Sequence, residues 1–372
     1  MTIEKFYTII CIENNLVRCN FITGLSNPLC VVDFFVEGEM GEIVYDKPFK
    51  TYKEQIEILK NKYKLNIKNE NFALELLSTI SYYDLINGSK ESFFEKDSEI
   101  FEENTDIIDL FLFKILDKNI QNTLFKYSVY VENIFKTKMA YLISRKYGIS
   151  IEQYLNEKNY YLPINFQRRE KRNQTLKAIL AVATDNKYKN DPTEYYKKYH
   201  NHIPAWILFK NVNFTDIIDL YSFLKLEDKL EIAKEYCNNA SQLKDEELVE
   251  LLKNSITIVR KFRNRIAHNL KVITYRAKGN NLKLKNIKNF LPNQFIGKND
   301  YKNKIGINDL FSMISSITFL LKNETLIFQM FSELKADFNL ISLQKMVKKY
   351  KKVTNFPQNI EKRFDIILGK EK

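Results

Sequence analysis

Three polar residues near the middle of the chain have spacings that would bring their side chains together on a helix. In the stretch "RKFRNRIAHN" (260–269), Asn264 and His268 are four residues apart and would share one helical face. Arg263 lies one position, or about 100°, away from Asn264, and its long side chain can span that offset. The three residues together offer an imidazole that titrates near neutral pH, a permanent cation suited to phosphate oxygens, and an orienting amide.

These groups have the chemistry needed to cleave RNA without a metal ion. The reaction needs a base for the ribose 2′-hydroxyl, an acid for the leaving 5′-oxygen and a cation beside the phosphate. A single helix supplies one histidine, and no arginine precedes His200 or His202 at a comparable spacing. We therefore expect two chains to pair about a two-fold axis and share one cleft. A simpler interpretation stays open, since a basic helix with a carbonyl-capping histidine would show the same spacing.

A long amphipathic helix is predicted to position these residues. Residues 245–269 carry an apolar stripe at helical spacing, and the three polar residues lie off it, towards solvent or a partner. Few glycines and prolines interrupt the chain, which favours long helices and an all-α fold. The stripe consists of Leu248, Leu252, Ile256, Val259, Phe262 and Ile266. Other helical patterns cover 51–65, 69–88 (closed by Gly88), and 106–147 (closed by Gly148).

The remaining segments suggest how the chain is divided. The apolar stretch 310–331, interrupted by Lys322, Asn323 and Glu324, predicts a buried core helix rather than a membrane span. Residues 30–49 could hold a strand, and Met40 is an alternative start of the protein. We predict an unplaced N-terminal extension (1–46), an N-terminal helical subdomain (47–105), a helical bundle with the motif (106–271) and a basic C-terminal helical region (272–372).

Charge is distributed unevenly along the chain. The formal net charge is +12, and residues 271–372 hold 20 Lys and Arg against 8 Asp and Glu, whereas the first 270 residues are balanced. A basic third is what a phosphate-binding surface needs, although a low-GC genome rich in lysine codons would also produce it. A polar connector, 157–177, contains the basic run "QRREKR". The predicted RNA-binding residues are Arg168, Arg169, Lys171, Arg172, Arg260, Arg265, Arg276, Lys283 and Lys285.

Other residue types add little chemistry. The four cysteines show neither a CxxC pair nor metal-ligand spacing, so we expect reduced thiols, no metal and no cofactor in a cytoplasmic protein. No secretory signal is evident. Tyr82 and Tyr83 could stack on bases, although adjacent tyrosines more often belong to a core.

Several stretches resemble the AbiD/AbiF-type abortive-infection family, whose C-terminal part contains a HEPN-type helical domain. The similarity covers roughly residues 47–360. It rests on "KPFKTYKEQIEILKNKYKLNI", "ISYYDLING", "VENIFKTKMAYLISRKYG", "HIPAWILFKNVNFTDIIDLY", "RNRIAHN" and "NFPQNIEKRF". The resemblance implies a HEPN-type helical bundle and a metal-independent endoribonuclease that works as a homodimer.

The resemblance also suggests roles for individual residues. Arg263, Asn264 and His268 correspond to the Arg-Asn-x-x-x-His element, and Asn269 stands where members often carry a second histidine. Glu132 in "VENIFKTK" would face the motif helix and orient Arg263 or the imidazole; alternatively it is a solvated i,i+4 partner of Lys136. The leading expectation is a ribonuclease toxin of phage defence. The alternatives are a non-catalytic protein that holds a small structured non-coding RNA, or a helical scaffold that senses a phage component.

Overall fold

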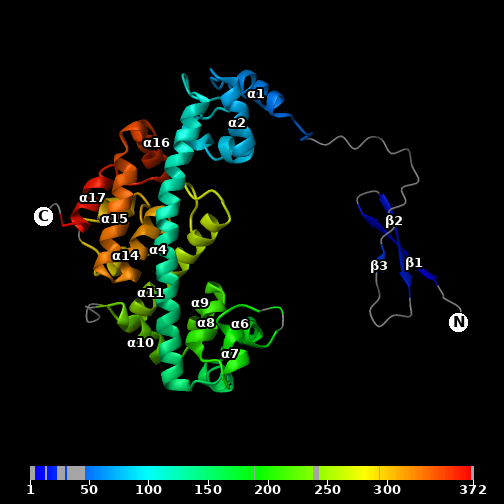
Figure 1. The fold of residues 1–372 in the computed structure, drawn as a ribbon, viewed down its shortest axis with the longest axis vertical. Coiled ribbons are helices and arrows are strands. Elements are labelled where there is room, and N and C mark those ends of the chain that lie inside the picture. The colour runs from blue at the N-terminus through cyan, green and yellow to red at the C-terminus, as the bar shows by residue number, and fades with distance from the viewer. Residues whose placement is uncertain are drawn as a thin grey trace. The chain divides into compact units, whose positions relative to one another are not determined.

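The computed structural model describes residues 5–12, 15–22, 30–31, 47–185, 187, 189–237, 243–292 and 294–369 (Figure 1). The chain forms two compact units, Met1–Thr51 and Tyr52–Lys372. In the first unit, β1 (Lys5–Ile12) pairs antiparallel with β2 (Asn15–Ile22), and β2 pairs with β3 (Cys30–Val31). β3 lies within residues 30–49, the stretch that could hold a strand. Residues 32–46, which include Met40, lie outside the described residues.

The second unit is helical, which confirms the predicted all-α class for this part of the chain. It forms a single compact unit, and the predicted divisions after residues 105 and 271 stay predictions. Its helices are α1 (Tyr52–Asn61), α2 (Glu70–Thr79), η1 (Tyr83–Asn87), α3 (Lys90–Phe93), α4 (Ile107–Tyr147), α5 (Ile151–Tyr154), η2 (Glu157–Asn159), α6 (Phe166–Thr184), α7 (Thr193–Tyr199), α8 (Ala205–Asn211), α9 (Phe214–Phe223), α10 (Leu226–Glu235), α11 (Asp245–Ala267), α12 (Leu284–Ile287), α13 (Lys298–Lys302), α14 (Leu310–Leu321), α15 (Glu324–Asn339), η4 (Ile341–Leu343), α16 (Gln344–Thr354) and α17 (Ile360–Ile367).

Helix α4 is the spine of this unit and runs along its whole length in Figure 1. Its 41 residues correspond to about 60 Å of helix. Asp106 caps the start by accepting the Ile108 backbone N–H at 3.1 Å, and Gly148, with a φ of 102°, ends the helix as predicted. Helices α11, α14, α15 and α16 pack against this spine, whereas α6 packs against α9.

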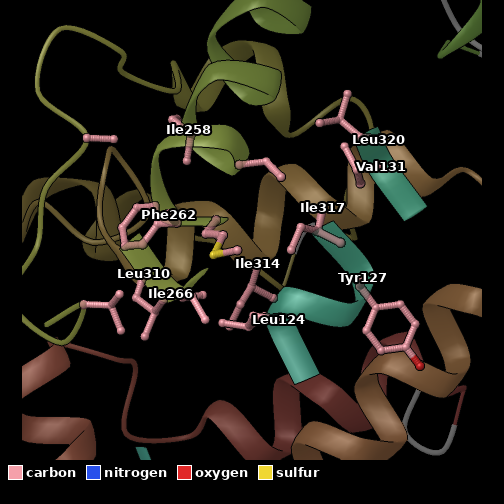
Figure 2. Packing of buried hydrophobic residues seen from close by; sticks show 14 of the residues in the cluster. Leu124, Tyr127, Val131, Ile258, Phe262, Ile266, Leu310, Ile314, Ile317 and Leu320 are labelled. Atoms are coloured by element: carbon pink, nitrogen blue, oxygen red, sulfur yellow. The ribbon is translucent and has the colours of Figure 1, made fainter. Parts of the chain in front are cut away.

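The core beside the motif is formed by α4, α11 and α14 (Figure 2). Phe262 from α11, Ile314 from α14 and Leu124 from α4 are each fully buried. Burying one such side chain stabilises the fold by roughly 1.5–3 kcal/mol. All six residues of the predicted α11 stripe are buried, so the predicted orientation of this helix is confirmed.

The predicted single helix over 69–88 is wrong, because the chain breaks it after Thr79. The Ser81 hydroxyl accepts the backbone N–H of Asp84 at 3.1 Å and starts a new turn, the π-helix η1. Gly88 closes η1. A Cβ at Gly88 would lie 2.1 Å from the Asp84 carbonyl oxygen, so only glycine fits there without a shift of the backbone.

The stretch 310–331 forms two helices, and its first half is the predicted buried core helix. Every residue of α14 is buried. Lys322 adopts a left-handed conformation with a φ of 55° and ends α14, and Asn323 then caps α15 by accepting the Leu326 backbone N–H at 2.9 Å. Among the residues that the structure describes, no helix combines the length and the apolar character that a membrane span requires.

Candidate functional site

The C-terminal end of α11 carries the predicted motif. Because the apolar stripe of α11 packs against α14 and α4, Arg263 and Asn264 are left only partly buried. His268 is the C-cap residue, and its backbone N–H donates to the Asn264 carbonyl oxygen at 3.1 Å. The helical spacing of these residues is therefore as expected.

Arg263 is held by residues of α4 and of its own helix. Its guanidinium lies 3.2 Å from Glu132 Oε2 and 5.7 Å from the centre of the Phe125 ring. Nη1 donates to Asn264 Oδ1 at 3.2 Å. Glu132 also pairs with Lys136 at 2.8 Å, so its carboxylate contacts both Arg263 and Lys136. The side chains of Glu132 and Arg263 are 13% and 30% exposed, which leaves the ion pair half-shielded with the guanidinium reachable from outside.

The imidazole of His268 is placed differently. The residue is exposed, and within the described part of the chain its ring makes no hydrogen bond or ion pair. A single chain thus fixes the arginine and amide of the motif and leaves the imidazole facing outward.

Asn269 points towards a small cavity beside the motif. Its φ of 55° turns the chain sharply after α11. Its side-chain oxygen accepts from the Lys118 ammonium, and its side-chain nitrogen lies 3.5 Å from Asp84 Oδ2. Lys118 and Asp84 are more than 100 residues away in the sequence, which is why sequence patterns did not identify them.

Five of the predicted RNA-binding residues line two neighbouring basic cavities. The first, of about 250 Å³, is lined by Arg168, Lys171 and Arg260. The second, of about 530 Å³, is lined by Arg265 and Arg276. Sequence reasoning missed the other cations at these walls, which are Lys253 in the first cavity and Lys261, Lys271 and Lys278 in the second. The cavities adjoin, because Asn280 in the first wall accepts from Lys261 in the second at 2.7 Å.

The other four predicted RNA-binding residues lie elsewhere. The segment 166–177 is part of α6 rather than a connector, and this helix places Arg172 inside, 4% exposed and 2.9 Å from Glu157. Arg169 is exposed and donates to the Pro163 carbonyl oxygen. Lys283 and Lys285 pair with Glu250 and Glu247 at the start of α11.

Burial and neighbouring positive charges lower the pKa of two lysines near the cavities. Burial, with repulsion from Lys253 and Arg168, lowers the pKa of Lys229 to about 8. Burial, with repulsion from Arg260, also lowers the pKa of Lys261. Cations held this close to one another favour a polyanionic ligand. No group of three or more His, Cys, Asp and Glu residues that could hold a metal ion is found among the described residues.

The sequence profile of the family described as Abi-like protein matches residues 75–274, which is more than half of the chain and includes Glu132 and the whole motif. The chain belongs to this family. Family membership supports a role in abortive-infection defence. No curated protein and no solved structure matches the chain.

Proposed function

We propose that the chain is a metal-independent endoribonuclease of the HEPN type, a toxin of cytoplasmic phage defence that is held in check until infection. One observation carries the proposal. One helix end carries an exposed His268 and, five residues before it, Arg263, whose guanidinium Glu132 holds in place, while Arg260 and Arg265 of the same helix line two basic cavities. An exposed imidazole and a buttressed guanidinium on one helix end are the groups that the proposed chemistry needs.

In the proposed reaction, two copies of the chain meet so that their motifs face one cleft. One His268 takes the proton of the ribose 2′-hydroxyl, and the 2′-oxygen forms a new bond to phosphorus. The bond from phosphorus to the 5′-oxygen breaks, and the second His268 protonates that oxygen. The Arg263 guanidinium stabilises the charge on the phosphate. The products are a 2′,3′-cyclic phosphate and a free 5′-hydroxyl.

Cleavage of labelled RNA in EDTA tests the proposal. We expect His268→Ala to lower the rate by about 100- to 10,000-fold, the usual contribution of general acid–base groups, and Arg263→Ala to lower it by at least about 100-fold. His202→Ala is the matched control, because His202 lies outside the motif and its ring contacts Asn201 at 2.7 Å. Equal rates for all four proteins would refute the proposed function.

A second candidate is a non-catalytic protein that holds a small structured non-coding RNA. The two basic cavities favour it, since they need no chemistry to bind phosphates. Binding that weakens steeply with salt and survives His268→Ala, without cleavage by the wild type, would support this second function.

A further inference from the structure

A third cavity, smaller than the two basic ones, adjoins the motif. It has a volume of about 120 Å³ and lies between η1, α4 and the turn that follows α11. Asn269, the residue after His268, forms part of its wall. Anything bound there would therefore lie next to the proposed cleavage site.

Four cations and two carboxylates line this cavity, and one of the cations, Lys271, also pairs with Glu91, so its walls keep a small positive excess. The cations are Lys114, Lys118, Arg265 and Lys271, and the carboxylates are Asp84 and Asp117. Burial raises the pKa of the Asp117 carboxyl, and the nearby Lys114 and Lys118 charges oppose this shift.

The positions of Lys114 and Lys118 destabilise helix α4 when no anion lies between them. They are four residues apart on α4, where like charges repel each other. Lys118 has partners, since its ammonium donates to Asn269 and, at 3.1 Å, to Gln121 Oε1. Lys114 has no hydrogen bond or ion pair with any described residue, and its ammonium would lie 3.9 Å from a Cβ at Gly88. An unpaired ammonium beside a second one in a cavity is the arrangement expected of a phosphate site.

An aromatic ring stands on the wall of the same cavity. Tyr83, at the start of η1, lines it and is 72% exposed. Its neighbour Tyr82 is partly buried, and burial raises the pKa of the Tyr82 hydroxyl to about 12, so only one tyrosine of the pair is presented to a ligand. Exposed aromatic rings beside cations are the usual means of binding unpaired nucleotides.

We propose that this cavity binds one nucleotide of the RNA, next to the nucleotide that is cut, with its phosphate at Lys114 and Lys118 and its base stacked on Tyr83. The inference rests on the proposed function only in that the ligand is RNA, because it concerns binding and not cleavage. Stacking tolerates any base, so the site would select single-stranded RNA rather than a particular sequence.

Binding can be measured separately from cleavage with RNA whose 2′-hydroxyls are all methylated, since that RNA lacks the attacking group. We expect Lys114→Gln to weaken binding of this single strand about fivefold at 0.15 M salt. The slope of log affinity against log salt should fall by about 1, the effect of losing one phosphate contact. Tyr83→Ala should weaken binding about fivefold or more. Matched controls are Lys348→Gln, an exposed lysine on α16, and Tyr141→Ala, an exposed tyrosine on α4.

Thermal unfolding distinguishes a binding role from a structural one. Lys114 makes no hydrogen bond or ion pair, and its repulsion of Lys118 is opposed by its attraction to the Asp117 carboxylate, so Lys114→Gln should change the melting temperature little while it weakens RNA binding. A lysine needed only for folding would show the opposite, a lower melting temperature with unchanged affinity.

Two results would overturn the nucleotide site. In the first, Lys114→Gln and Tyr83→Ala bind the methylated RNA with the affinity and salt slope of the wild type; the proposed ribonuclease would still stand if His268→Ala abolished cleavage. In the second, Lys114→Gln abolishes binding of free adenosine monophosphate in calorimetry while RNA binding is unaffected, which would assign the cavity to a free nucleotide.

Discussion

The basic side chains beside the two ends of α11 have different kinds of partner. At the N-terminal end, Lys283 and Lys285 pair with the carboxylates of Glu250 and Glu247. Towards the C-terminal end, three cations of the helix donate instead to neutral oxygens: Arg260 to the Thr215 hydroxyl, Lys261 to the Lys278 carbonyl, and Arg265 to the Lys271 carbonyl. Arg263, between them, pairs with Glu132.

Neutral acceptors fix the position of a cation without cancelling its field. Arg260, Lys261 and Arg265 are therefore ordered without a carboxylate partner, which suits them to phosphate groups. At the N-terminal end, Lys283 and Lys285 already form ion pairs with carboxylates, which RNA would have to displace. We infer that RNA binds beside the motif and avoids the start of the helix, although the sequence predicted RNA-binding residues in both regions.

The largest expected effect comes from removing charge at the C-terminal end. Arg260→Gln with Lys261→Gln should reduce affinity for 2′-O-methyl RNA about 30-fold at 0.15 M salt and lower the salt slope by about 2, because two phosphate contacts are lost. Fluorescence anisotropy over a salt series measures both quantities.

The matched control is Lys283→Gln with Lys285→Gln, which removes the same charge from the other end. It should bind RNA as the wild type does. If both double variants lost the same affinity for RNA, net charge alone would drive binding. The proposed difference between the two ends of α11 would then be wrong.

The next effect concerns Glu132, the carboxylate that does reach the motif. Glu132→Gln should lower the cleavage rate about tenfold or more, because Arg263 loses the charge that holds it in position. Affinity for methylated RNA should be unchanged or slightly higher. Single-turnover kinetics together with anisotropy separate the two quantities.

Lys136→Gln is the control for Glu132, since it leaves the contact of Glu132 with Arg263 in place. It should cleave nearly as fast as the wild type, and Glu132→Asp should recover part of the lost rate. If the Glu132→Gln protein cleaved RNA at the wild-type rate, Glu132 would have no role in positioning Arg263 for cleavage.

A smaller effect should appear in the pH dependence of stability. Lys229 has a pKa of about 8 in the fold against an ordinary value of 10.5, so above pH 8 the unfolded chain binds the proton more readily. Stability from this group therefore rises between about pH 8 and 10.5 and is lost as the pH falls through 8. Lys229→Gln should melt higher than the wild type at pH 7, by on the order of 1 °C, and the gap should close towards pH 10. A constant gap from pH 7 to 10 would contradict the assignment.

The smallest effect is expected at the N-terminal end of α11, where the lysines are paired with carboxylates. Lys283 and Lys285 are 47% and 68% exposed, so losing both ion pairs should leave the midpoint of urea denaturation nearly unchanged. Urea denaturation of the same Lys283→Gln, Lys285→Gln variant provides this measurement. A clear drop of the midpoint would show that this end is a structural network rather than a solvated surface.

Local patterns in the sequence predicted the helices well. The α11 stripe and the glycine that ends α4 depend on periodicity and on backbone conformation, and both are readable within one segment. The break after Thr79 was missed because a serine hydroxyl, rather than a glycine or proline, starts the new turn. The sequence also resembled the family to which the chain belongs.

The walls of the site were harder to predict, because they join distant segments. Spacing on one helix indicated Arg263 and His268, but nothing local shows that Lys118 reaches Asn269. Arg172 and Lys171 are neighbours in one basic run, yet the helix buries the first and exposes the second. Composition shows that a chain is basic, whereas only packing shows which cations meet a carboxylate.

The outward position of His268 has a consequence for how activity would depend on the concentration of the protein. On the proposed mechanism, one copy of the chain holds half of the proton-transfer machinery and cannot supply the rest from its own described residues. Below the dissociation constant of the dimer, active enzyme then grows with the square of protomer concentration. A tenfold rise in abundance would raise killing about a hundredfold. Scarcity would keep an uninfected cell safe, and a burst of synthesis would be enough to poison it.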